Sequence, residues 1–149
     1  MNNLFQWIYK KITVSIIGQE AIESDATDIQ IASGNQTPAS AGAITLATIS
    51  VPLGFYCVVG DVDFFAGAAA VLTASYTNPA TGATVNRYVA AAAGGYVEDP
   101  HDFKDRPFFA VYNDPTVSQA TISITFSTTA AASTQYIVNA AYVIRGSKL

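Results

Sequence analysis

The segment SVPLGFYCVVGDVDFFAG, residues 50–67, is the most apolar stretch of the chain and decides the fold. Valine and aromatic side chains dominate it, which is typical of a strand buried on at least one face. Glycine interrupts it at Gly54, Gly60 and Gly67, so it is too short and too broken for a membrane span of ~20 apolar residues. Gly60 lies inside the pattern and predicts a bulge or a close backbone approach. We therefore expect the central strand or strand pair of a sandwich here.

Turn signals divide the rest of the chain into further short strands. The clearest is a hairpin in which the turn residues 78–82 separate two β-rich flanks. Strands are expected at 28–31, 44–51, 71–77, 83–89, 108–112, 122–127 and 136–144, and loops at 33–42, 97–107 and 128–134. This pattern predicts an all-β fold: a single jelly-roll-like β-sandwich of eight to nine strands, with residues 19–149 as one domain.

Residues 1–18 differ from everything that follows them. Apolar residues first recur at helical spacing and then alternate with polar ones from residue 12, which predicts a short amphipathic helix followed by a strand. The apolar run after Lys11 is only about six residues, shorter than the core of a signal peptide. We expect an assembly arm that packs on its own domain or on a neighbouring subunit. Trp7, Tyr9 and the two lysines would also suit contact with a membrane interface. The apolar residues of this arm are Leu4, Phe5, Trp7, Ile8, Ile12, Val14 and Ile16.

The composition is poor in charge. Of 149 residues, 50% are hydrophobic and only 12% are charged, whereas average globular chains carry roughly 25% charged residues. A free monomer needs surface charge for solubility, so the deficit favours a subunit whose surface is covered by other copies or carries Thr, Ser and Asn. The net charge of −4 argues against direct binding of nucleic acid.

The loop 97–107 carries the one cluster of potential metal ligands. Carboxylates could hold a calcium ion together with backbone carbonyls, but the spacing matches no EF-hand and no glycine marks a coordinating turn. A solvated loop is the expectation, with a hard-cation site as the alternative and no cofactor. The candidate ligands are Glu98, Asp99, Asp102 and Asp105, beside the sole histidine, His101.

No motif in the chain indicates catalysis. Asp61 and Asp63 could form a glycosidase-like pair, but flanking apolar residues favour the solvent face of a half-buried strand. Cys57, the single cysteine, is expected to be a small buried hydrophobic residue. The many tyrosines could stack on sugars, although tyrosine in strands more often packs at the edge of the core. We expect a protein that is not an enzyme.

The Ala/Thr/Ser-rich strands, the sequence Ser50-Val51-Pro52-Leu53-Gly54-Phe55 and the ending 137–146 resemble small β-sandwich virion proteins of bacterial and archaeal viruses. The resemblance covers residues 44–146. It implies a homo-oligomeric capsid, decoration or vertex subunit in a virion, with copies of itself and other structural proteins as partners. Two alternatives stay open: an extracellular filament subunit that assembles by strand donation of residues 12–17, and a carbohydrate-binding module.

Overall fold

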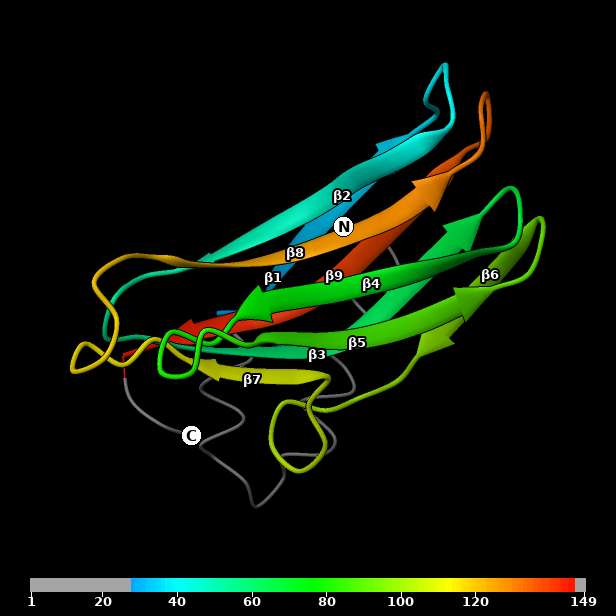
Figure 1. Ribbon diagram of the computed structural model, residues 1–149. Coiled ribbons are helices and arrows are strands. Elements are labelled where there is room, and N and C mark those ends of the chain that lie inside the picture. The colour runs from blue at the N-terminus through cyan, green and yellow to red at the C-terminus, as the bar shows by residue number, and fades with distance from the viewer. Residues whose placement is uncertain (1–27, 147–149) are drawn as a thin grey trace, which may run out of the picture.

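The computed structural model describes residues 28–146, and these residues form nine β-strands in two stacked antiparallel sheets (Figure 1). The arm residues 1–18, with their expected helix and strand, lie outside the described residues. Among residues 28–146, no helix has the length and apolarity to cross a bilayer. The strands are β1 (Gln30–Gln36), β2 (Gly42–Val51), β3 (Tyr56–Ala66), β4 (Ala70–Thr77), β5 (Thr84–Ala91), β6 (Gly95–Asp99), β7 (Phe109–Tyr112), β8 (Ile122–Ala130) and β9 (Tyr136–Arg145).

The strand order is that of a jelly roll. One sheet runs β1-β9-β3-β6, with β7 also paired to β3, and the other runs β2-β8-β4-β5. The first strands therefore pair with the last: β1 with β9, β2 with β8, β3 with β6 and β7, and β4 with β5. A long antiparallel ribbon wound into two sheets gives this arrangement. The predicted jelly-roll-like sandwich of eight to nine strands is confirmed.

The core lies between the two sheets and is built by residues that alternate along each strand. On β3, Cys57, Val59, Val62 and Phe64 point inward. The largest fully buried side chains come from both sheets, and each contributes ~1.5–3 kcal/mol by leaving water. They include Phe64, Tyr136 and Val138 from one sheet and Ile49, Leu72, Ile124 and Phe126 from the other.

The bulge predicted at Gly60 is present. The register of β3 against β9 shifts between Val59 and Val62, and at the same level the partner on the other side changes from β7 to β6. The close neighbour at Gly60 is the ring of Phe103, because a Cβ added there would lie 2.9 Å from its Cε1 atom. The loop between β6 and β7 thus folds over the bulge of the central strand.

Three strands extend clearly into segments that were expected to be loops. β1 continues to Gln36 inside the expected loop 33–42, β6 (residues 95–99) takes residues 97–99 from the expected loop 97–107, and β8 continues to Ala130 inside the expected loop 128–134. Gly34, Asn35 and Gln36 in β1 have weak strand propensity, but pairing with β9 holds them in the sheet. β6 and the end of β8 contain valine, tyrosine and threonine, which suit strands, and pair with β3 and β2.

Candidate functional site

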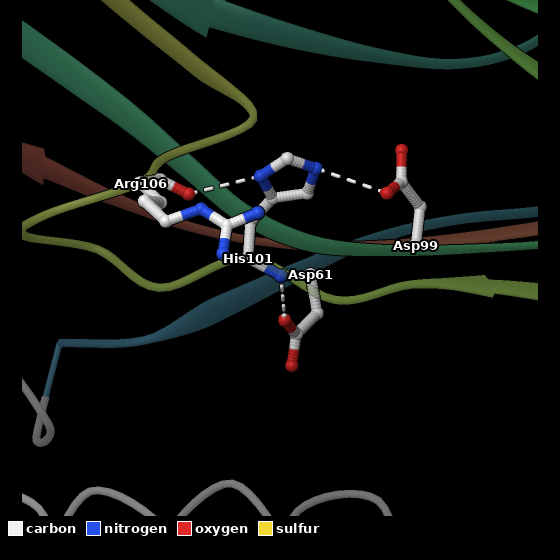
Figure 2. A network of polar contacts seen from close by, with 4 residues as sticks. All are labelled: Asp61, Asp99, His101 and Arg106. Carbon is white, nitrogen blue, oxygen red and sulfur yellow. Dashed lines mark hydrogen bonds and ion pairs between the residues drawn. The ribbon is translucent and has the colours of Figure 1, made fainter.

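The β6–β7 loop is held by a network around His101 (Figure 2). The backbone N–H of His101 donates to Asp61 Oδ1 at 2.6 Å. The two ring nitrogens lie 2.9 Å from the carbonyl oxygen of Arg106 and 3.0 Å from Asp99 Oδ1. The ring also packs edge-on against buried Phe108, with 5.5 Å between the centroids. His101 therefore connects the loop to the bulge in β3 and to the end of β6.

The four candidate cation ligands have separate positions. Glu98 and Asp99 belong to β6, and Asp99 is engaged by His101. Asp102 Oδ1 accepts hydrogen bonds from the backbone N–H groups of Lys104, Asp105 and Arg106, at 3.0, 2.6 and 3.0 Å. Within the part of the chain that the structure describes, no three His, Cys, Asp or Glu side chains gather as metal ligands. Asp102 closes the turn of its own loop, and Asp105 is exposed.

Asp63 alternates with the core residues Val62 and Phe64 and lies on the outer face of its sheet, as expected, but it is buried there and not exposed to solvent, so the expected exposure was wrong. It is 8% exposed, and its register partners are Asn139 on β9 and Glu98 on β6. Burial raises the pKa of Asp63 to about 6, a hydrogen bond from Tyr96 opposes this rise, and the charges of Glu98 and Asp61 add to it. Its Oδ1 has no hydrogen-bond partner. Because Asp61 supports the loop and Asp63 is buried, the two aspartates do not form a glycosidase-like pair.

A shallow groove of about 430 Å³ lies on the outside of the sheet that contains β3. We call it the outer groove, and its walls come from β3, β7 and the β6–β7 loop. The rings of Tyr56 and Tyr112 stack at one side of it, with centroids 4.1 Å apart. Its lining includes Tyr56, Val58, Phe103, Lys104, Pro107, Ala110 and Tyr112.

The three most exposed tyrosines among residues 28–146 do not share one face. Tyr96 and Tyr112 lie on the outside of the sheet that contains β3, but they pair with its opposite ends, at Phe65 and Tyr56. Tyr88 lies on the other sheet. A row of stacking rings for a sugar chain would need them side by side.

The outer face of the β2-β8-β4-β5 sheet is uncharged at every outward position. We call it the hydroxyl face, because serine and threonine fill most of it. The sequence already holds the signal, since these residues alternate with core residues in each strand, but only the sheet order brings the strands together. Its residues are Ala43, Thr45, Thr48 and Ser50 on β2, Ser123, Thr125, Ser127 and Thr129 on β8, Val71, Thr73, Ser75 and Thr77 on β4, and Thr84, Asn86, Tyr88 and Ala90 on β5.

The sequence matches no protein-family profile and no curated protein. Among solved structures, a carbohydrate-binding module in complex with β-1,4-galactotriose is similar, with a TM-score of 0.46 and 13% identity over 80% of this chain and 83% of that one. T=1 particles derived from infectious bursal virus give a TM-score of 0.43 and 15% identity over 79% of this chain. The VP2 subviral particle of infectious bursal disease virus gives 0.39 and 14%, also over 79%.

This chain spans 32% of the length of each of the two viral chains. At these identities and TM-scores the likenesses assign neither a family nor a function to this chain. They give no support to an origin in a bacterial or archaeal virus.

Proposed function

We propose that this protein is a non-enzymatic structural subunit of a homo-oligomeric assembly, as a capsid, decoration or vertex protein of a virus particle. The observation that carries the proposal is the hydroxyl face. Four strands form this face without one outward-pointing charged side chain. Only 12% of the residues of the whole chain are charged. A second copy is the partner that such a face fits best.

The free energy of association supports this choice. Burying a charged side chain against a neighbour costs several kcal/mol unless it is paired, and the hydroxyl face has no such cost. Its serine and threonine side chains can donate to and accept from a neighbouring copy. Val71 and Tyr88, 47% and 62% exposed, add apolar area that would leave water on association.

A carbohydrate-binding module is the alternative from another class. It would need neighbouring exposed rings on one face. Tyr96 and Tyr112 lie at opposite ends of β3 and Tyr88 lies on the other sheet, so their placement favours the assembly proposal.

The test measures molar mass by light scattering after size exclusion over a wide range of protein concentration. The native chain is expected to form a defined oligomer. The double variant Thr73→Glu/Thr125→Glu puts two carboxylates on adjacent strands of the hydroxyl face and is expected to be monomeric. Ala132→Glu, at an exposed position in the β8–β9 turn, is the matched control and should assemble like the native chain.

A native chain that stays monomeric at every concentration would contradict the proposal. If the chain assembles, electron microscopy of the assemblies distinguishes a virion subunit from a filament subunit. Closed shells support the virion subunit, whereas open fibres would replace it with the filament subunit. A monomer that binds oligosaccharides on a glycan array would replace it with the carbohydrate-binding module.

A further inference from the structure

One part of the outer face of the sheet that contains β3 and β9 is apolar, around Val58 on β3 and Ala141 and Val143 on β9. On β9, Tyr136, Val138 and Ala140 point into the core. The alternate positions Ile137, Asn139, Ala141 and Val143 therefore point outward, and all but Asn139 are apolar. Ala141 and Val143 are nevertheless buried, as is their neighbour Val58 on β3. A stretch of strand that is apolar on both faces, such as residues 140–143 of β9, is typical of a sheet covered on both faces.

The sandwich core covers only the inner face of this sheet. On the outer face, Phe103 packs over Gly60. Beside it the outer groove remains open between Phe103, Pro107 and Ala110. Ile31 on the edge strand β1 is 36% exposed. This face thus offers a groove with an apolar floor and an aromatic rim to a further segment of chain.

We propose that the N-terminal segment of the same chain, residues 1–27, docks on this face and places apolar side chains of its arm in the outer groove. Leu4, Phe5, Ile8 and Ile12 recur at helical spacing, so a helix over these residues would present one apolar stripe. Such a stripe needs an apolar surface to cover it, and the groove supplies one of matching character.

The position at which residues 1–27 join the sandwich favours the arm of the same chain as the occupant of the groove. The described residues begin at Asp28, and Gln30 pairs with Tyr142, which in turn pairs with Val59. The segment therefore enters the sheet at the level of the groove, two strand spacings or ~10 Å from β3. The roughly ten residues between the arm and Asp28 can span ~35 Å when extended. A short tether of this kind gives an effective concentration in the millimolar range.

The chain contains its own probe, because Trp7 is its only tryptophan and lies in the arm. The full chain is measured by tryptophan emission and acrylamide quenching, at concentrations at which light scattering shows a monomer. The expected result is a blue-shifted emission and a quenching constant several-fold lower than that of the denaturant-unfolded chain. Ala110→Lys, at an exposed groove position, is expected to restore fast quenching. Ala80→Lys, an exposed alanine in the β4–β5 turn, should leave Trp7 protected.

Two results would overturn the inference for the native chain. Trp7 could be quenched as fast as in the unfolded chain, or protected only at concentrations at which copies associate, which would assign the groove to a neighbour's arm. If Trp7 stays protected from quenching in Ala110→Lys, the outer groove is not the site at which the arm docks. Circular dichroism confirms that each variant is folded. The molar mass tests the proposed function separately. A monomer with a protected Trp7 would support the docking of the arm and contradict the assembly, whereas an oligomer with an exposed Trp7 would do the reverse.

Discussion

The backbone of Leu46 lies directly against Gly34, so close to its Cα that the carbonyl oxygen of Leu46 leaves no room for a Cβ. The two residues come from β1 and β2, which belong to different sheets. Leu46 is the extra residue of a bulge in β2, between Thr45 and Ala47. Beside it, Gln36 Nε2 donates to the carbonyl oxygen of Thr45 at 2.6 Å. The bulge and the glycine together bring the two sheets into contact at this side of the sandwich.

Gly34→Ala is therefore expected to destabilise the fold by about 2–3 kcal/mol, since the new methyl group can be placed only by moving backbone. Urea unfolding followed by circular dichroism measures the change. Ser33→Ala, at the outward-facing neighbour on β1, is the matched control and should change the free energy of unfolding by less than ~0.5 kcal/mol. Equal stability of the two variants would show that the sheets are not held this closely.

Asn113, in the β7–β8 connection, joins this connection to the end of β2 and to the β2–β3 turn. Its side-chain Nδ2 donates to the carbonyl oxygens of Val51 and Ala120 at 2.9 and 2.8 Å. Its backbone accepts from Gly54 and donates to Phe55. Asn113→Ala leaves two carbonyl groups without this donor and is expected to cost about 2–4 kcal/mol. Asn86→Ala, on the exposed part of β5, is the control in the same thermal unfolding experiment, and a comparable loss in both would refute the role of Asn113.

The sequence predicted the fold better than it predicted the features of the surface. Alternation around Phe126 and Val138, the hairpin turn at 78–82 and the glycine at position 60 were enough for the strands, the sandwich and the bulge. The predictions failed for segments such as 33–36, where small polar residues form a strand only because β9 pairs with them. No local pattern contains the identity of a cross-strand partner.

The candidate site was harder to predict for the same reason. Asp63 has the local pattern of a solvent-exposed residue, yet β6 and β9 flank it and it is buried. The buried role of Asn113 is equally invisible in a sequence that reads as a turn. The hydroxyl face and the outer groove both come from strands distant in sequence, so sheet order was needed before either could be seen.

Cys57 is expected to be inert in the folded protein. It is fully buried on the core side of β3, and burial raises its pKa to about 12. Because only the thiolate reacts, labelling by a thiol reagent at pH 8 should be slower than in the denatured chain by orders of magnitude. The reaction rate with and without denaturant checks this, and fast labelling under native conditions would contradict it.

The β6–β7 loop should depend on Asp102. Its carboxylate accepts hydrogen bonds from three successive backbone N–H groups. Asp102→Ala is therefore expected to lower the free energy of unfolding by about 1–2 kcal/mol and to accelerate hydrogen exchange at residues 104–106. Asp102→Asn keeps an acceptor oxygen and should be intermediate. The matched control is Asp105→Ala, whose side chain is exposed in the same loop. Unchanged exchange in Asp102→Ala would show that other contacts, such as those of His101 and Phe103, hold the loop.

Asp63 should make the protein less stable as the pH rises from about 4 to 6. Its pKa is about 6 in the folded chain and 3.8 as the ordinary value, so in this range the folded state keeps a proton that the unfolded state has lost. Stability falls with pH wherever the folded state binds more protons. Below pH 4 both states are protonated and the effect vanishes, and above pH 6 the loss is complete.

Asp63→Asn removes this titration. We expect the variant to match the native chain at pH 3.5 and to exceed it by about 1–2 kcal/mol at pH 7.5, where solvent at the sheet edge screens part of the full penalty. Glu98→Gln, which removes the like charge opposite Asp63 on β6, should produce a smaller gain of the same sign. Urea unfolding at the two pH values measures both variants. If the free energies of unfolding of Asp63→Asn and the native chain differ by the same amount at both pH values, then burial does not raise the pKa of Asp63.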